Sequence, residues 1–310
     1  MNLIDTFKYL VALEQHKHFS RAARACHITQ PALSNAIKAL EDELNIKIVN
    51  RGRIYQGLTD EGKRVLSTAY NVLNETEALK QDVNFRKGNP SGKFTLGCVP
   101  SALPVATRFA VLLSENFSEI TPSVRSMASH EIELNFENHL IDLAFGYVDR
   151  FELTSTEHNI KHQYFEKYFL VKALDKTHEK TEFLDEISWQ SASKEKLCLL
   201  TSEMYNRVLV NQFFKTIDIE IKPTLETDSI FSLLLSVQKS AFSTILPGPV
   251  AHVANKYDGL KISRLINPKT ETSMGLLIPS NKHLTILQEK ALEIATDPSW
   301  EVELKLMTIP

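Results

Sequence analysis

An apolar stripe near the start of the chain recurs at helical spacing. Its members follow one another at steps of four, three and four: Leu33, Ile37, Leu40 and Leu44. Thr29 precedes this run as a favourable N-cap, and Pro31 falls in the first turn, where a missing N–H costs little. A shorter helical segment lies just before it. Two helices joined by so short a link predict a helix-turn-helix, whose second helix would enter a DNA major groove.

The polar side of this second helix carries hydrogen-bonding groups. At about 100° per residue, Pro31, Asn35 and Lys38 point away from the apolar stripe, and Gln30 and Ser34 flank it. Asn and Gln can pair with adenine edges, and Ser can pair with several bases. A solvated helix face would look similar, so this pattern alone leaves both interpretations open.

The segment from Ile46 to Leu58 predicts a short β-hairpin after the helix. Arg51 and Arg53 flank Gly52 at its tip, where they would reach a phosphate or a minor groove. A hairpin wing that carries arginines beside a polar helix face favours DNA binding over simple solvation.

Together these motifs resemble the winged helix-turn-helix of LysR-type transcriptional regulators. The matching residues are Phe19-Ser-Arg-Ala-Ala23, Thr29-Gln-Pro-Ala-Leu-Ser34, Leu40-Glu41, Leu44, Arg51 and Leu58-Thr59 followed by Gly62. His18, Asn45 and Ile48-Val49 depart from the usual pattern, although Asn45 can adopt the left-handed conformation that a glycine would provide. The resemblance implies a sequence-specific, DNA-binding transcription regulator that forms a homodimer or homotetramer, binds a small-molecule effector and contacts RNA polymerase. The candidate DNA-binding residues are Ser20, Thr29, Gln30, Pro31, Ser34, Asn35, Lys38, Arg51 and Arg53.

A long helix follows, capped by Thr59 and running to about Phe85. It carries a heptad-like seam formed by Val65, Ala69, Val72, Thr76, Leu79 and Val83. The seam could pack on its own domain, but we favour pairing with the same helix of a second subunit, because few other elements remain to cover it. The turn-rich segment from Lys87 to Gly92 then ends the helix and marks a domain boundary.

Beyond this boundary, strand and helix patterns alternate, which predicts an α/β domain with a mostly parallel sheet. The chain would cross to a second lobe at about residues 158–173 and return at about 262–272. The expected organisation is a winged helix-turn-helix at 1–58, a linker and dimerisation helix at 59–87, and an effector-binding domain at 93–310. Lobe I would hold about 93–160 and 270–310, and lobe II about 161–269, as in the periplasmic-binding-protein-like domain of the resembled family. The tail from Trp300 to Leu306 alternates strictly and predicts a late strand.

In such sheets, ligands bind beyond the carboxyl ends of the strands. The candidate effector-binding residues at these ends are Ser101, Ser129, His130, Thr201, Ser202, Thr227, Leu246 and Pro247. Each hydroxyl could instead cap a helix, but the set as a whole favours a cleft that would accept an effector, including an anionic one. Ser240 to Phe242 replaces a Gly-x-Gly that is common before the Leu-Pro pair, so we expect a small, altered or closed pocket.

Composition narrows the remaining choices. The charge is −3 overall; residues 1–88 carry +3 and the remainder −6, which suits contact with a few phosphates rather than a broad basic surface. Cys26, Cys98 and Cys198 are widely spaced and suggest neither a disulfide framework nor a zinc site. The sequence offers no membrane span, signal peptide, cofactor motif or catalytic motif, so we expect a cytoplasmic protein that is not an enzyme. The alternative is a cytosolic small-molecule-binding protein whose N-terminal segment serves only for dimerisation.

Overall fold

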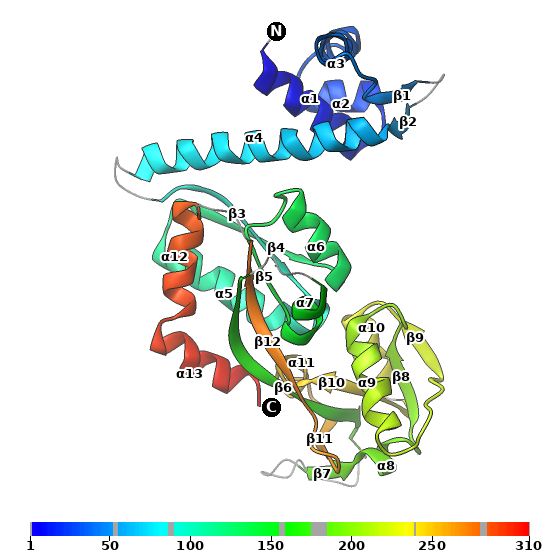
Figure 1. The fold of residues 1–310 in the computed structure, drawn as a ribbon. Helices are drawn as coiled ribbons and strands as arrows, with labels where there is room; N and C mark the ends of the chain where they lie inside the picture. Colours follow the sequence, from blue (N-terminus) through cyan, green and yellow to red (C-terminus); the bar gives the residue numbers. More distant parts are fainter. Residues whose placement is uncertain are drawn as a thin grey trace. The chain divides into compact units, whose positions relative to one another are not determined.

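The computed structural model describes residues 2–51, 55–85, 90–154, 159–174, 185–238, 240–279 and 284–309. They fall into two compact units, Met1–Gly88 with Asn135–Leu140, and Asn89–Leu134 with Ile141–Pro310. Figure 1 shows the elements of each.

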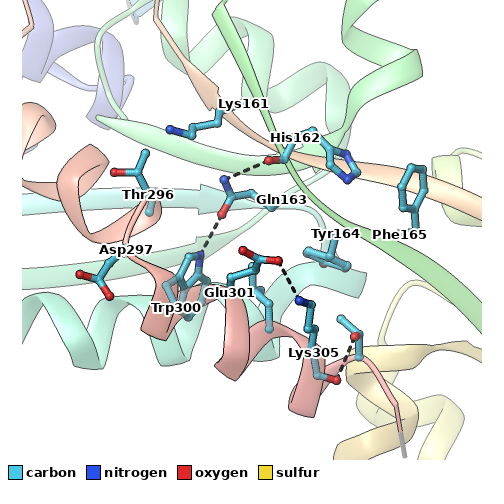
Figure 2. Close-up of a pocket in the computed structure, with 13 residues that line it drawn as sticks. Lys161, His162, Gln163, Tyr164, Phe165, Thr296, Asp297, Trp300, Glu301 and Lys305 are labelled. Atoms are coloured by element: carbon cyan, nitrogen blue, oxygen red, sulfur yellow. Dashed lines mark hydrogen bonds and ion pairs between the residues drawn. The ribbon is translucent and has the colours of Figure 1, made fainter.

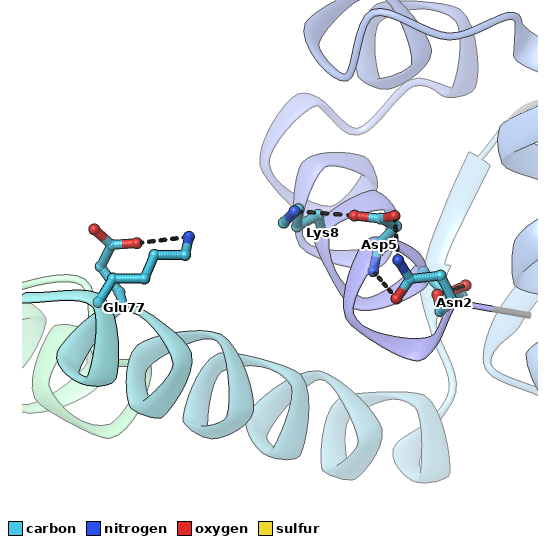
Figure 3. Close-up of polar contacts among 6 residues, drawn as sticks. Asn2, Asp5, Lys8 and Glu77 are labelled. Atoms are coloured by element: carbon cyan, nitrogen blue, oxygen red, sulfur yellow. Dashed lines mark hydrogen bonds and ion pairs between the residues drawn. The ribbon is translucent and has the colours of Figure 1, made fainter. Parts of the chain in front are cut away.

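The first unit holds three helices, a two-stranded hairpin and a long helix. These are α1 (Leu3–His16), α2 (Phe19–Ala25), α3 (Gln30–Leu44), β1 (Val49–Arg51), β2 (Tyr55–Leu58) and α4 (Asp60–Phe85). Asn2 caps α1 by accepting a hydrogen bond from the Asp5 N–H at 3.5 Å, and Lys8 pairs with Asp5 at 2.9 Å (Figure 3). In α3 the Thr29 hydroxyl accepts from the Ala32 N–H, and Asn45 ends the helix at φ 53°. Both predicted ends of the second helix are therefore present.

The helix-turn-helix core is built from three of the four residues of the predicted apolar stripe. Leu33, Ile37 and Leu40 are at most 1% exposed and pack with residues of α1, α2, β1 and β2. Leu44, in the last turn of α3, is 46% exposed and lies outside this core. Gly62 in the first turn of α4 makes this packing possible, because a Cβ there would lie 2.1 Å from the carbonyl oxygen of Ile48. The hairpin and the long helix are thus held together by a close backbone approach.

The apolar seam of α4 divides into two parts. Its first half packs on the helix-turn-helix core of its own unit: Ala69 is fully buried, and Val65 and Val72 are partly buried against the same core. Its second half faces outward, because Leu79 is 63% and Val83 46% exposed. The sequence favours pairing of the seam with a second subunit. For the first half of α4 the alternative is correct, because this half packs on its own domain.

The second unit is an α/β domain around one ten-stranded sheet. Its strands are β3 (Gly92–Cys98), β4 (Ile120–Ser126), β5 (Leu143–Tyr147), β6 (Asn159–Ala173), β7 (Asp185–Ser188), β8 (Lys196–Leu200), β9 (Leu225–Thr227), β10 (Phe242–Pro247), β11 (Leu260–Ile266) and β12 (Glu271–Ile278). The helices are η1 (Pro100–Ala102), α5 (Leu103–Asn116), α6 (Ser129–Glu137), α7 (Val148–Thr154), α8 (Trp189–Ala192), α9 (Tyr205–Lys215), α10 (Ile230–Val237), α11 (Gly248–Ala254), α12 (Ile286–Ala295) and α13 (Pro298–Met307).

The strand β6 joins two lobes of this domain. Its first part, Asn159–Lys167, pairs antiparallel with β12, and its second part, Tyr168–Lys172, pairs antiparallel with β10. On either side of this shared strand the sheet is parallel: β4-β3-β5 in lobe I and β10-β8-β9 in lobe II. Parallel pairing therefore holds within each lobe, whereas the crossing strands are antiparallel.

The C-terminal strand predicted for Trp300–Leu306 is wrong, because these residues lie in the helix α13. Asp297 caps this helix, Pro298 occupies its first turn, and Lys305 pairs with Glu301 one turn away at 2.8 Å. Trp300 and Leu304, at most 3% exposed, are its buried face. The Trp300 ring packs on Phe109, with ring centroids 5.2 Å apart. The buried residues are thus four positions apart, as in a helix, rather than two apart, as in a strand.

In the part of the chain that the structure describes, no helix combines the length and the hydrophobicity that crossing a lipid bilayer would need.

Candidate nucleic-acid interface and ligand cavity

The N-terminal half of α3 presents a polar, solvent-exposed face. Gln30, Pro31, Asn35 and Lys38 are exposed and Ser34 is half-buried, while Leu33 and Ile37 on the opposite side are buried. Two further candidates, Ser20 in α2 and the N-cap residue Thr29, are also exposed. Seven of the nine predicted DNA-binding residues therefore have surface outside the core. The side chain of Arg51 and the whole of Arg53 lie outside the described residues.

A buried carboxylate, to which the sequence analysis assigned no role, fixes the hairpin to α3. Glu41, 1% exposed, accepts hydrogen bonds from the backbone N–H groups of Ile48 and Val49 at 2.9 and 3.1 Å. Both amides belong to the chain that enters β1, so the carboxylate sets where the hairpin leaves the helix. In the sequence this residue looked like part of an exposed acidic run that continues through Asp42 and Glu43. Only those two neighbours are exposed.

The second strand of the hairpin is anchored through Tyr55. Its phenol donates a hydrogen bond to Glu14, and its ring meets Phe19 edge-on at 6.0 Å. Burial, followed by the Glu14 contact, raises the pKa of Tyr55 above its usual value, so the phenol stays neutral. The hairpin is thus tied to α1, α2 and α3. Arg21 and Arg24 are exposed on α2 and add positive charge that the sequence analysis did not assign to DNA contact.

Between the two lobes of the α/β domain lies a small cavity. Its lining comes from lobe I (Val99, Pro100, Ser101, Ala128, Ser129, Tyr147) and from lobe II (Leu200, Met204, Tyr205, Asn206), and none of these side chains is charged. The free volume is about 10 Å³, roughly the space of one water molecule. The lobes therefore lie in a closed arrangement, and the expectation of a small or closed pocket agrees with this volume.

Tyr147, at the end of β5, takes part in each of the hydrogen bonds described across the cavity. Its hydroxyl lies 2.8 Å from the Ser101 hydroxyl and accepts from the Asn206 side-chain amide at 3.3 Å. Its ring lies 5.1 Å from that of Tyr205. Burial, followed by the nearby Glu166, raises the pKa of Tyr147 far above its ordinary value, so the phenol remains a neutral hydrogen-bonding group. Ser101 and Tyr147 from one lobe and Asn206 from the other thus form a polar contact between the lobes.

The eight predicted effector-binding residues occupy different places. Ser101 and Ser129 line the cavity, and the Ser129 hydroxyl is buried without a hydrogen-bond partner among the described residues. The other six do not line it. His130 and Ser202 are exposed, the Thr201 hydroxyl is buried without a described partner, and Thr227 accepts a hydrogen bond from the Ser229 N–H at 3.2 Å. Leu246 and Pro247 are buried in β10.

Sequence reasoning identified only Ser101 and Ser129 among the ten lining residues. Of those that it missed, Tyr147, Tyr205 and Asn206 have polar side chains. A signal for them existed, because Tyr147 ends the strand β5 and the other two fall in the first turn of the helix α9. Phe242, whose bulk had suggested a narrowed pocket, packs instead in the apolar core of lobe II. The cavity is small because the side chains of both lobes fill it.

A second, larger pocket of about 540 Å³ lies on lobe I, between the first part of β6 and α13 (Figure 2). The Trp300 indole N–H donates to Gln163 at 2.8 Å at its base, and Lys305 pairs with Glu301 at its wall. His162 and Phe165 stand at one side with ring centroids 4.6 Å apart. Its lining mixes acidic, basic and aromatic groups, most of which already contact one another.

The cysteines lie apart from both cavities. Cys98 and Cys198 are fully buried and Cys26 is half-buried; all three are free thiols. Burial raises the pKa of Cys98 to about 12, which keeps it as a poorly nucleophilic thiol. Among the residues that the structure describes, no three His, Cys, Asp or Glu side chains come together as a metal site would require.

The architecture defines a class: a winged helix-turn-helix joined to a two-lobed α/β domain with a cavity between the lobes. Two family models match the chain in the same order. Residues 4–63 match the bacterial regulatory helix-turn-helix proteins of the lysR family, and residues 87–297 match the LysR substrate binding domain. The chain belongs to the LysR family.

Curated relatives resemble about half of the chain. The hydrogen peroxide-inducible genes activator of Pectobacterium carotovorum is 31% identical over 145 residues, and the DNA-binding transcriptional dual regulator OxyR of Escherichia coli K12 is 31% identical over 143. An SDS degradation transcriptional activation protein of a Pseudomonas species is 32% identical over 142 residues. Each match covers 46% of this chain and 45–48% of the relative, so the chain spans about half the length of the curated relatives it matches.

Solved structures resemble nearly the whole chain in fold. A cysteine variant of full-length OxyR from Pseudomonas aeruginosa covers 95% of this chain and 96% of its own, with a TM-score of 0.70 and 18% identity. Full-length CbnR in complex with its target DNA covers 94% of this chain and 99% of its own, with a TM-score of 0.67 and 17% identity. At such identities the likeness concerns the fold alone.

Proposed function

We propose that the protein is a sequence-specific transcription regulator that binds duplex DNA through α3 and the hairpin, and whose activity is controlled by a small molecule bound between the two lobes. The single observation that carries this proposal is the exposed polar face of α3, opposite the buried side chains of Leu33, Ile37 and Leu40, beside a hairpin fixed by Glu41. A solvated helix would not need a buried carboxylate that sets the position of a neighbouring wing. Membership of the LysR family supports the same function.

The contacts with DNA divide into two kinds. Gln30, Pro31, Ser34 and Asn35 face outward near the N-terminus of α3 and would read base edges in the major groove. Lys38, Arg51 and Arg53 would contact phosphates and hold the protein in register. Ser20 and Thr29 stand beside the first group, where short hydroxyl side chains suit phosphate or sugar contacts.

Two copies of the chain would bind an inverted repeat. The outward-facing Leu79 and Val83 on the second half of α4 provide an apolar surface for the same helix of a second subunit. A homodimer, or a homotetramer formed from two of them, would then place recognition helices on two half-sites. Contact with RNA polymerase in the cytoplasm completes this proposal.

The effector would enter where lobe I and lobe II meet at Tyr147 and Asn206. Ser101, Ser129, Tyr147 and Asn206 supply hydroxyl and amide groups, and the unpartnered Ser129 hydroxyl is free to hold a ligand. The lining side chains are uncharged, so a small polar molecule fits them directly, and a carboxylate would depend on hydroxyl and backbone N–H donors. His130, Thr201, Ser202, Thr227, Leu246 and Pro247 would act only in a more open arrangement of the lobes.

Selection of duplexes from a random pool by the full chain tests this function. We expect enrichment of an inverted repeat, and salt titrations on that duplex then separate the two kinds of contact. Arg51→Ala should weaken binding to every duplex and flatten the salt dependence, whereas Ser34→Ala should mainly relax sequence preference. Ser67→Ala, an exposed serine of α4, is the matched control. Failure to enrich any sequence at low salt would favour the alternative, in which the N-terminal unit serves only for dimerisation.

A further inference from the structure

A carboxyl group is buried where the two lobes of the α/β domain share a strand. Glu166 is fully buried in β6. It pairs in register with Thr272 of β12, whereas Tyr168, two residues later, already pairs with Pro247 of β10. Glu166 therefore lies at the crossing point of the chain, about which any opening of the lobes must turn.

Among the residues that the structure describes, hydroxyl groups surround this carboxyl group. One oxygen, Oε1, accepts from the Tyr164 hydroxyl at 3.4 Å, and Ser101 lowers the pKa of the group. The other oxygen, Oε2, has no hydrogen-bond partner among the described residues. The remaining groups that interact with it electrostatically are the phenols of Tyr147 on β5 and Tyr168 on β6.

Ser101 connects the surroundings of Glu166 to the interlobe cavity. It lowers the pKa of the Glu166 carboxyl group, and its hydroxyl lies 2.8 Å from that of Tyr147, which accepts from Asn206 of the opposite lobe. In the closed arrangement water does not reach Glu166, since it is fully buried and the cavity beside Ser101 has room for about one water molecule. An unpartnered carboxylate oxygen in such a place is costly, whereas a neutral carboxylic acid is tolerated.

We propose that the closed arrangement of the lobes requires Glu166 to be neutral, and that loss of its proton favours an open arrangement in which water reaches the carboxylate. The proton is thus a regulatory ligand of the hinge, independent of DNA binding and of any effector. No bond other than O–H changes, and the proton goes to solvent.

The sign of the effect follows from the pKa. Burial raises the pKa of Glu166 to about 8 in the closed form, with smaller opposing contributions from Ser101 and Tyr164. A glutamate exposed to water has a pKa of about 4.3, so the open form loses the proton at a lower pH than the closed form. Between these values each unit rise in pH should change the closed-to-open ratio by about tenfold in favour of the open form, and above the closed-form pKa the effect levels off.

An interlobe distance measures this equilibrium in the full chain. Labels on Ser114→Cys, at the exposed end of α5, and Lys215→Cys, on α9, report it in a Cys26→Ser background, since the other two cysteines are buried. We expect a shift to longer distances as the pH is raised from about 6 to about 9. Glu166→Gln, which cannot ionise, should keep the short distance throughout. Glu271→Gln is the matched control, because this glutamate lies opposite Lys167 in the pairing of the same two strands but is exposed and forms an ion pair with Lys269. This variant should behave as the unchanged chain.

Infrared difference spectra of the unsubstituted chain give a readout that does not depend on the Gln variant folding. A neutral-acid carbonyl band should be present at about pH 7, above the pKa of about 6 to which burial raises that of Asp142, and lost at about pH 9. A distance that does not change with pH, an unaltered pH response in Glu166→Gln, or the absence of a neutral-acid band at about pH 7 would each overturn the proposal.

Discussion

Replacing Glu41 by alanine should detach the hairpin from the recognition helix. The change leaves the buried N–H groups of Ile48 and Val49 without the carboxylate that accepts from both, at 2.9 and 3.1 Å. A buried donor left unsatisfied costs about 1–3 kcal/mol, so the two together should destabilise the N-terminal unit by about 2–6 kcal/mol. Glu41→Gln keeps an acceptor oxygen and loses only the charge, so a loss of about 1 kcal/mol is expected.

Amide hydrogen exchange at Ile48 and Val49 is the local assay, because it reports those two donors directly. We expect both amides to lose protection in Glu41→Ala and to keep most of it in Glu41→Gln, with DNA affinity falling in the same order. Glu43→Ala, an exposed acid of the same helix, is the control and should match the unchanged chain. Equal protection in the Glu41→Ala and Glu43→Ala variants would refute the role of this carboxylate.

Three further outcomes follow from the structure. Leu79→Asp should convert the proposed dimer to a monomer in sedimentation experiments, because it places a charge on a 63%-exposed apolar residue of α4, whereas Leu79→Met should not; a dimer that survives both would contradict pairing through this helix. Hydrogen peroxide should leave DNA affinity unchanged, because burial raises the pKa of Cys26 and raises that of Cys98 to about 12, and Cys198 is fully buried. A peroxide response abolished by Cys26→Ser or Cys98→Ser would show otherwise. Trp300→Ala should lower the free energy of unfolding, measured in urea, by about 3–5 kcal/mol, because it removes a side chain that is only 1% exposed. Trp300→Phe should lower it less, and equal losses in the two variants would contradict the role of Trp300 packing.

Local patterns predicted the N-terminal unit well because each signal there is complete within a few residues. The stripe Leu33, Ile37 and Leu40, the cap at Thr29 and the left-handed Asn45 each depend on neighbours in sequence. The role of Glu41 could not be predicted for the opposite reason. Its partners are the backbone N–H groups of Ile48 and Val49, and backbone groups leave no mark in the sequence.

The cavity shows the same limit in the α/β domain. The alternation of elements predicted two lobes and placed Ser101 and Ser129 at strand ends that line the cavity. Tyr147 and Asn206 are brought together only by the contact of two lobes, 59 residues apart along the chain. For the C-terminal segment, alternating polarity suggested a strand, but the burial of Trp300 and Leu304 by lobe I selected a helix. Long-range packing therefore decided what short-range periodicity left ambiguous.

The central claim is that the exposed face of α3 reads bases, and a specificity ratio tests it most directly. The measurement is the affinity of the full chain for its selected duplex divided by its affinity for a scrambled duplex, at one salt concentration, for the unchanged chain and for Asn35→Ala. Since a bidentate side chain–base pair supplies about 1–3 kcal/mol of discrimination, we expect the ratio to fall by about 5- to 150-fold while affinity for the scrambled duplex is retained. An unchanged ratio in Asn35→Ala, and equally in Gln30→Ala and Ser34→Ala, would contradict the account.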